Sequence, residues 1–227
     1  MLSRTNMAAS IAASLAQTKP FNLVPRQEIE RLAPSCASRH LKPGSIVSSE
    51  VDWRDNLWII TGGLLRLSMQ ASFGGTTTVG IMRPGDIVGC LNGVCRHKHP
   101  MEGLVIGDCL FIVVPRPLYL DLLRYPEFSL GIIHILGERL WDAQVMRAVA
   151  AQDSEKRLAW ILLWLYGKLG RSIPMTRQLI AEAAGVARET SIRILSPMEK
   201  KGWIKTRRGV IELNRPDKLR EALDSRD

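Results

Sequence analysis

The sequence lacks an apolar run long enough to cross a membrane. Its longest such run, LAWILLWLYG from Leu158, falls short of the roughly 20 residues that a membrane-spanning helix needs. The alanine-rich start carries Arg4, but Ser10 and Ser14 interrupt the apolar core that a signal peptide would have. We therefore expect a cytoplasmic protein with no membrane partner and a flexible N-terminal extension over residues 1–20.

Cysteine is scarce as well. Four cysteines in 227 residues are too few for a disulfide framework, and the cytoplasm keeps thiols reduced. Free thiols or ligands are therefore expected at Cys36, Cys90, Cys95 and Cys109. The composition, with 46% hydrophobic and 23% charged residues, excludes extensive disorder.

The sequence between His40 and Pro115 alternates short β-rich runs with Gly-Gly and Pro-Gly pairs. This spacing is typical of an all-β roll or barrel, which we place in a domain over residues 21–125. Its inward faces are predicted to hold Ile59, Leu65, Leu67, Val79, Ile81, Ile87, Ile106 and Ile112. Such a roll can serve as a core alone or can also enclose a ligand.

After Pro126 the apolar residues recur at three- and four-residue steps, which predicts one long helix over residues 126–151. The apolar stripe is narrow, as in helices that pair with another helix. We expect it to form the interface of a homodimer through Ile133, Leu136, Leu140 and Ala143. The alternative is packing against its own roll, and both contacts can exist on different faces.

Residues 152–227 carry the signals of a small helical domain. Asp153 is a good N-cap for a helix that follows it. Thr176 can cap a second helix running to about Ala183, Gly185 supplies a left-handed turn, and a third helix begins near Ala187. The pattern predicts a helix-turn-helix.

The helix after this turn divides its residues between two faces. Apolar spacing assigns four to the core: Ser191, Ile194, Leu195 and Met198. Arg188, Glu189 and Arg193 fall on the opposite face, near the helix N-terminus. Arginine can bind guanine O6 and N7 together and glutamate can accept from the cytosine amino group, so these three residues are predicted to read bases in a major groove. The alternative is a merely solvated charged face.

The stretch GWIKTRRGVIEL after this helix predicts a wing, with two short strands joined by a basic turn at Arg207 and Arg208. The wing is placed to contact phosphates. The chain has a net charge of +9, and Lys and Arg outnumber Glu by seven between residues 168 and 215. A basic block confined to one domain indicates a nucleic-acid partner.

Several landmarks between Arg39 and Asn214 resemble those of the Crp/Fnr family of bacterial transcription regulators. They are LKPG, GGLLRL and RPGDIVG in the roll, the long helix, and TRQ…G…RET…R in the helix-turn-helix. The resemblance implies an α+β fold: a jelly-roll-like β-roll, a dimerisation helix and a C-terminal winged helix-turn-helix.

The resemblance also implies function. It implies a homodimer that binds palindromic double-stranded promoter DNA with half-sites close to 5′-TGTGA, and RNA polymerase as a partner if the protein is an activator. By this resemblance, Arg188, Glu189 and Arg193 are expected to contact bases, and no enzyme activity is implied. Contacts with the DNA backbone are expected from Thr176, Arg177, Gln178, Thr190, Lys205, Arg207 and Arg208.

The chain departs from the family pattern at two places. Pro197 lies inside the expected recognition helix, where proline removes a backbone donor and clashes with the preceding turn, so we expect a kink or an early end. Cyclic-nucleotide members of the family have an acidic residue after the glycine of the roll, and about ten residues later an Arg-Ser or Arg-Thr pair. Here Gly89 is followed by Cys90, and the later segment reads CRHKHPMEG. We therefore expect a signal other than a cyclic nucleotide.

One cluster in this segment could carry a sensing chemistry: Cys90, Cys95, His97 and His99. Thiolate and imidazole are ligands of zinc and haem iron, and a thiol beside basic residues can act as a redox switch. Free cysteines and surface histidines on a loop are the simpler interpretation. Two other functions stay open: a thiol- or metal-dependent redox protein or enzyme built on this cluster, and a sensor that acts through protein partners.

Overall fold

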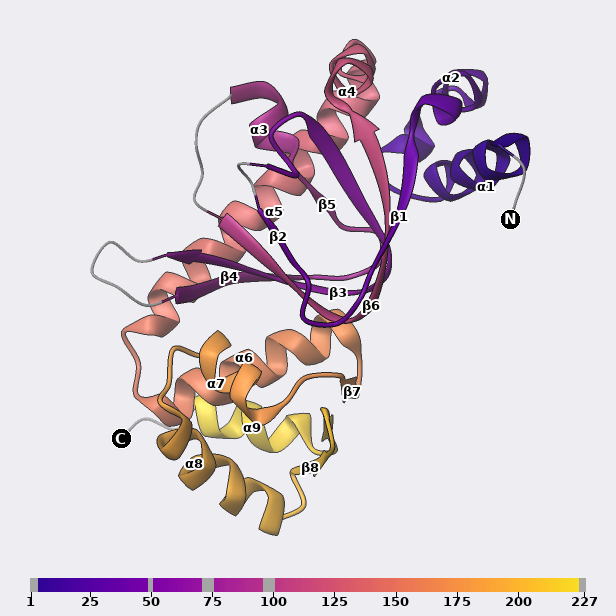
Figure 1. Ribbon diagram of the computed structural model, residues 1–227. Helices are drawn as coiled ribbons and strands as arrows, with labels where there is room; N and C mark the ends of the chain where they lie inside the picture. The colour runs from indigo at the N-terminus through magenta and orange to yellow at the C-terminus, as the bar shows by residue number, and fades with distance from the viewer. Residues whose placement is uncertain (1–3, 49–50, 71–75, 96–100, 225–227) are drawn as a thin grey trace. The chain divides into compact units, whose positions relative to one another are not determined.

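The computed structural model of the chain describes residues 4–48, 51–70, 76–95 and 101–224 (Figure 1). The chain forms two compact units, one of residues 1–70 and 81–140, the other of residues 71–80 and 141–227. The division lies within the long helix, between Leu140 and Trp141, whereas the sequence analysis placed the domain boundary after that helix. Within the described ranges, no helix is long and apolar enough to cross a membrane.

Most of an antiparallel sheet belongs to the first unit, whereas residues 76–80 of its strand β4 are grouped with the second unit. The strands found in the described residues are β1 (Ala37–Leu41), β2 (Ile46–Ser48), β3 (Asn56–Gln70), β4 (Thr76–Met82), β5 (Ile87–Val88) and β6 (Met101–Pro115). They follow the order β1-β6-β3-β4, and β2 and β5 pair with β6 and β3. The pairing of β3 with β6 runs from Asn56 opposite Pro115 to Met69 opposite Met101.

A bulge interrupts this long pairing at Gly62 and Gly63, where the register shifts. Gly63 has a φ of +77°, and a Cβ at this position would lie 2.3 Å from the backbone oxygen of Asp108. Only glycine fits here, and the extra residue bends the strand. The Gly-Gly pair therefore lies within a continuous strand and does not separate two strands.

The two faces of β3 supply two apolar cores because successive side chains point to opposite sides. Leu57 and Ile59 pack under the helices, whereas Trp58 and Ile60 pack inside the roll. Most of the predicted inward positions are buried: Ile59, Leu65, Leu67, Ile81, Ile87 and Ile112. The prediction was wrong for Val79, which is 36% exposed, and Ile106 is half-buried.

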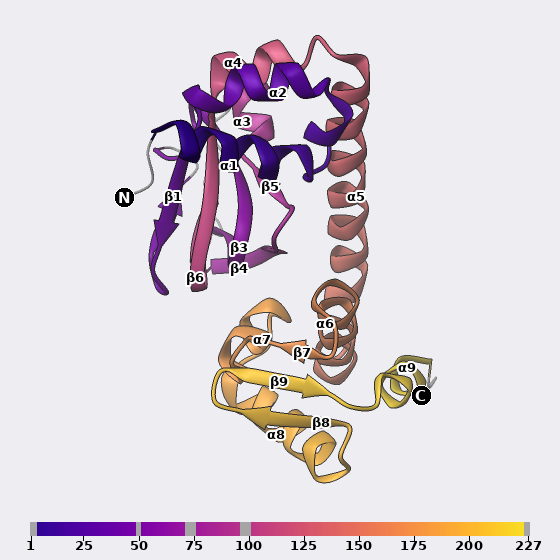
Figure 2. The same ribbon diagram turned by 90° about the vertical axis from the view of Figure 1, so that its right-hand side faces the viewer.

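The N-terminal residues form a helical layer, and the expectation of a flexible extension over residues 1–20 was wrong. This layer comprises α1 (Arg4–Ala16), the short helix Phe21–Leu23, α2 (Arg26–Leu32) and the short helix Ala33–Ser35. Ile11 and Leu15 are buried in one cluster with Phe128 and Ile132. The layer, whose helices α1 and α2 are drawn in Figure 2, therefore contributes side chains to the core of the first unit.

Three more helices follow: α3 (Cys90–Cys95), α4 (Arg116–Leu122) and α5 (Pro126–Ala150), and α5 continues beyond Leu140 into the second unit. Phe128 at the start of α5 packs edge-to-face against Phe21, with ring centroids 5.1 Å apart. The buried side of α5 holds this phenylalanine and Ile132. The first turns of the long helix are thus anchored to the N-terminal layer.

The second unit is a small domain of helices and a three-stranded sheet of order β7-β9-β8. Its elements are α6 (Ser154–Leu169), β7 (Ser172–Ile173), α7 (Arg177–Ala183), α8 (Arg188–Lys200), β8 (Ile204–Arg207), β9 (Val210–Leu213) and α9 (Pro216–Asp224). Asp153 caps α6 through its Oδ1, which accepts from the N–H groups of Glu155 and Lys156 at 2.8 and 2.9 Å. The capping predicted from the sequence is confirmed.

Candidate nucleic-acid interface

Helices α7 and α8 form a helix-turn-helix, as the sequence predicts. Thr176 caps α7, and its Oγ1 accepts from the N–H of Leu179 at 3.2 Å. Gly185 adopts a φ of +61° in the turn. The turn closes where the N–H of Val186 donates to the carbonyl of Ala181 at 2.9 Å. These local interactions determine where α8 begins.

Helix α8 presents a buried and an exposed face. Ser191, Leu195 and Met198 are buried, and the Ser191 hydroxyl donates to the backbone carbonyl of Arg188 at 2.7 Å. The side chains of Arg188, Glu189 and Arg193 are exposed. Among the residues that the structure describes, none of these three side chains forms an ion pair or hydrogen bond. Their polar atoms are therefore available to a partner.

Of the kink or early end expected at Pro197, the early end does not occur, because the helix continues to Lys200. Proline cannot donate to the carbonyl of Arg193, one turn earlier. Both residues are exposed, so water can bind this carbonyl. The first turns of α8, which hold the candidate base-reading residues, precede the proline.

Arg177 lies in an internal network that the sequence did not reveal. Its Nη2 donates to Oε2 of Glu199, and its Nε donates to Oγ1 of Thr206 at 3.1 Å. The N–H of Thr206 donates to Oε1 of Glu199 at 2.6 Å. This donation, together with the charge of Arg177, holds the pKa of Glu199 below its usual value. The network ties α7, α8 and β8 together.

The other residues predicted to contact phosphates make different interactions within the chain. Thr176 serves as the α7 cap, Gln178 donates to Oε1 of Glu182 at 2.9 Å, and Thr190 is half-buried. The wing is confirmed as the hairpin of β8 and β9, with Gly209 at a φ of +75° in its turn.

Three basic side chains lie on this wing. Arg207 forms an ion pair with Glu212, with Nε and Oε1 3.1 Å apart. Lys205 and Arg208 are exposed, and within the described part of the chain their side chains have no partner. Arg208 is thus the arginine of the wing turn that can meet a phosphate without breaking an ion pair.

Helix α5 carries an exposed apolar stripe whose members differ in part from the predicted seam. Leu130, Ile133 and Leu140 are 65%, 63% and 62% exposed. With Gly137 they follow steps of three, four and three residues, as in paired helices. A Cβ built on Gly137 would meet no atom within 4 Å.

The other two predicted seam residues behave differently. Leu136 is half-buried and packs against the core of the first unit, which is the alternative contact that the sequence left open for this helix. Ala143 is exposed, and so is Trp141. The exposed stripe therefore centres on Leu130, Ile133 and Leu140.

The candidate sensing cysteines lie on α3, not on a loop. Cys90 is buried and Cys95 is exposed, whereas His97 and His99 lie outside the described residues. Arg139 of α5 reaches Cys90 with its Nη1 3.8 Å from the sulfur, and its Nη2 donates to the carbonyl of Ile87. In the described residues, no group of three His, Cys, Asp or Glu side chains is arranged to hold a metal ion.

Cys109 and Cys36 behave as packing residues. The Cys109 Sγ donates to the carbonyl of Leu64 at 3.0 Å, and burial raises the pKa of this thiol. Burial also raises the pKa of Cys36, to about 12. Neither thiol is therefore ionised near neutral pH.

Comparison with known proteins assigns both halves of the chain. Residues 38–125 match the cyclic nucleotide-binding domain family, and residues 156–222 match the Crp-like helix-turn-helix domain family. The chain is 24% identical over 205 residues to the cyclic AMP receptor protein of Thermus thermophilus, covering 88% of this chain and 94% of that protein. The chain belongs to the Crp/Fnr family.

Two further proteins resemble most of the chain. The nitrogen fixation regulation protein FixK of Bradyrhizobium diazoefficiens is 28% identical over 194 residues, covering 81% of this chain and 80% of FixK. The solved structure of a Crp/Fnr regulator from Eubacterium rectale has the same fold, with a TM-score of 0.70 at 19% identity, covering 91% of this chain and 98% of its own.

Family membership confirms the predicted α+β fold, with a β-roll followed by a winged helix-turn-helix. It also makes the chain a DNA-binding transcription regulator and not an enzyme. The alternative of a redox enzyme built on Cys90, Cys95, His97 and His99 is thereby overturned. A sensor that acts only through protein partners is set aside as well, because the helix-turn-helix is a DNA-binding domain.

Proposed function

We propose that this Crp/Fnr regulator is a homodimer that binds palindromic promoter DNA through Arg188, Glu189 and Arg193. The observation that carries the proposal is that these three exposed side chains lie together at the start of α8 and have no internal partner within the described residues. A helix in the major groove brings its first turns to the base edges. Arg188 and Arg193 bind guanines, and Glu189 accepts from a cytosine amino group.

Phosphate contacts position the domain on DNA and carry no sequence information of their own. We assign them to the exposed Lys205 and Arg208, with Arg207 joining when it leaves Glu212. Contacts near α7 and α8 fall to Thr176, Gln178 and Thr190. Arg177, which is bound to Glu199 and Thr206, mainly holds the wing in place.

Dimerisation is assigned to α5. The exposed stripe of Leu130, Ile133 and Leu140 would be costly to leave in water, and it repeats at the spacing of paired helices. Gly137 has no side chain on this stripe, so two helices can approach closely there. Two copies related by a two-fold axis read an inverted repeat with half-sites roughly 34 Å apart. If the regulator activates transcription, RNA polymerase is a further partner.

The signal is proposed to be something other than a cyclic nucleotide. The residue after Gly89 is Cys90, a buried thiol, where cyclic-nucleotide members of the family have an acidic residue. The nearby guanidinium of Arg139 is bound to the carbonyl of Ile87. Micromolar cyclic AMP should therefore leave the melting temperature unchanged, because only a ligand that binds the folded state raises it. A dose-dependent rise would contradict this part of the proposal.

Selection from a random duplex library tests the DNA-binding proposal. Wild-type protein should enrich an inverted repeat with halves close to TGTGA. Arg193→Ala should cost about 1–3 kcal/mol per half-site and relax the preference at one base pair. Arg208→Ala is the matched control, since it should weaken all sequences alike and reduce the salt dependence. Enrichment without any inverted repeat would refute the proposal.

A further inference from the structure

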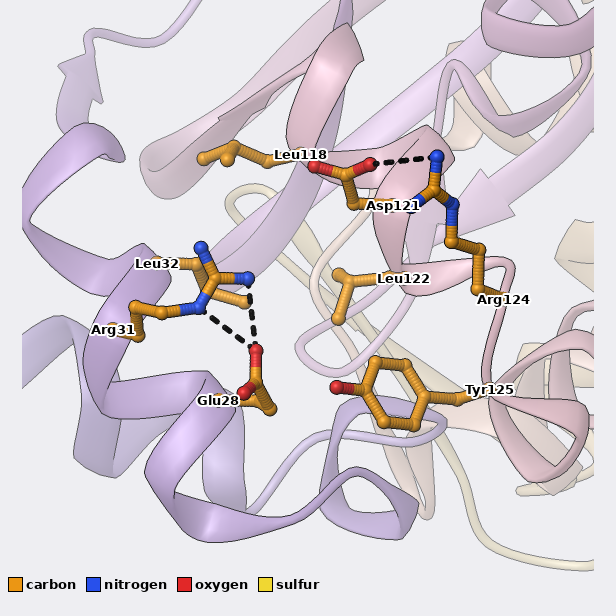
Figure 3. Close-up of a pocket in the computed structure, with 8 residues that line it drawn as sticks. All are labelled: Glu28, Arg31, Leu32, Leu118, Asp121, Leu122, Arg124 and Tyr125. Atoms are coloured by element: carbon orange, nitrogen blue, oxygen red, sulfur yellow. Dashed lines mark hydrogen bonds and ion pairs between the residues drawn. The ribbon is translucent and has the colours of Figure 1, made fainter.

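A cleft of about 260 Å³ lies in the first unit between α2 and α4 (Figure 3). One wall is formed by Glu28, Arg31 and Leu32, and the other by Leu118, Asp121, Leu122, Arg124 and Tyr125. The first wall lies outside residues 38–125, the part of the chain that matches the cyclic nucleotide-binding family. The N-terminal helical layer therefore creates a site that this family domain alone does not contain.

Each wall carries one positively and one negatively charged side chain. On α2, Nη2 of Arg31 lies 2.8 Å from Oε2 of Glu28. On the facing wall, Nη2 of Arg124 lies 3.9 Å from Oδ1 of Asp121. The pKa of Arg31 is raised by Glu28 first, and also by Tyr125 and Asp121 of the facing wall. The charged groups of the two walls line one shared space.

Polar groups remain available in this space. Figure 3 shows the Arg31 guanidinium and the Tyr125 hydroxyl pointing between the two walls. In the described part of the chain, this hydroxyl has no hydrogen-bond partner. The distance between Arg124 and Asp121 exceeds that of a good hydrogen bond, so both keep bonding capacity.

The cleft also has an apolar floor. Leu32 and Leu122 are each only 3% exposed, and Leu118 packs beside them. The volume is below the roughly 300–1,000 Å³ of drug-sized ligand pockets, so a small metabolite fits best. An aliphatic group could lie on these leucines.

Charge decides among the classes of small ligand. A phosphate or other simple anion would face Glu28 and Asp121, and a metal cation would face Arg31 and Arg124. A ligand that carries both charges meets a partner for each. We propose that this cleft binds a free aliphatic α-amino acid, with its carboxylate at Arg124 and Arg31, its ammonium group at Asp121 and its side chain on the leucine floor.

The cleft is joined to the start of α5. The N–H of Ser129 donates to the carbonyl of Tyr125 at 3.0 Å, and the Ser129 hydroxyl donates to the carbonyl of Leu123 at 2.7 Å. An amino acid that bridges α2 and residues 124–125 therefore holds the first turn of α5. Its effect on DNA binding rests on the proposed function of α5 in the dimer, whereas its binding does not.

Isothermal titration calorimetry of the full chain without DNA tests the binding. L-Leucine should bind with one site per chain. Three probes should each bind at least about tenfold more weakly, because each lacks one group. They are 4-methylpentanoate without the ammonium group, 3-methylbutylamine without the carboxylate, and glycine without the side chain.

Two variants locate the site, and a third serves as the control. Asp121→Asn and Arg124→Gln should each weaken L-leucine binding about tenfold or more. Glu30→Gln should leave it unchanged, since Glu30 pairs with Arg26 on the same helix but does not line the cleft. Absence of L-leucine binding, equal binding of 4-methylpentanoate, or binding unaffected by both cleft variants would overturn the proposal. Because DNA is absent, these results do not depend on the proposed promoter site.

Discussion

At the scale of single residues, the arginines of the second unit fall into two groups according to what they contact. Arg188 and Arg193 have no side-chain partner in the described residues, whereas Arg177 binds Glu199 and Thr206. The first two can therefore bind bases without breaking an internal bond. Substituting them should weaken DNA binding while stability is preserved, and substituting a member of the Arg177 network should lower stability.

Glu199 offers the clearest test of that network. Glu199→Ala removes the acceptor of the Thr206 N–H and the partner of Arg177. The site is partly exposed, so the free energy of unfolding should fall by about 1–2 kcal/mol, measured by urea denaturation near neutral pH. Glu221→Ala is the control, because Glu221 pairs with Lys218 on an exposed helix surface and should change stability by less than about 0.5 kcal/mol.

The same variant predicts a pH dependence. The pKa of Glu199 is lowered in the folded chain, so its contribution is present above the unfolded-state pKa, about 4.3, and is lost as the pH falls through the folded-state pKa. The stability difference between wild type and Glu199→Ala should therefore shrink on acidification below about pH 4. A difference that stays constant with pH would show that the charge of Glu199 contributes nothing.

At the scale of elements, local signals account for what the sequence could predict. The cap at Thr176 and the glycine at 185 lie within a few residues of the helix ends that they define, so α7 and α8 were predicted correctly. Helix α1 was not predicted, because Ile11 and Leu15 are buried in one cluster with Phe128 and Ile132, which lie far away in the sequence. Long-range packing of this kind leaves no local pattern.

Side-chain networks were hidden for the same reason. The bond between Arg177 and Glu199 joins residues 22 positions apart, and the sequence suggested only a phosphate contact for Arg177. The packing of Leu136 against its own core could not be predicted, because helical periodicity defines a stripe but not which edge of it the core covers. The exposure of Arg188, Glu189 and Arg193 was predicted because the helical period of α8 determines which side chains face solvent.

Helix α5 yields a prediction at this scale. Leu140→Glu should place a charge in the proposed helix pair and give monomers, measured by light scattering. Ile46→Glu is the matched control, because Ile46 is 65% exposed against 62% for Leu140 and lies on β2. Leu136→Glu is a poor probe, since Leu136 packs against its own core. A Leu140→Glu variant that remains dimeric would remove α5 from the interface.

At the scale of the whole molecule, the net charge of +9 is concentrated where DNA would bind. Lys and Arg exceed Glu by seven between residues 168 and 215. A charge excess of this kind attracts any duplex and cannot by itself distinguish one sequence from another. We therefore expect sequence preference to come from the few unpaired side chains of α8. The length of DNA that is read should depend on how many chains bind together.

Each chain carries one proposed base-reading face, so we expect specificity for a long site to require two linked copies. Linking two binding events raises the apparent affinity by about 100-fold or more over one event. Wild-type protein should therefore bind a palindrome at least about 100-fold more tightly than a duplex with one half-site, measured by fluorescence anisotropy at fixed salt. Leu140→Glu should bind both duplexes alike, with the wild-type affinity for one half-site, because the monomer keeps α8 intact and loses only the link. Ile46→Glu should keep the full difference. Equal binding of both duplexes by wild-type protein would mean that the two copies do not read DNA together, whatever the state of α5.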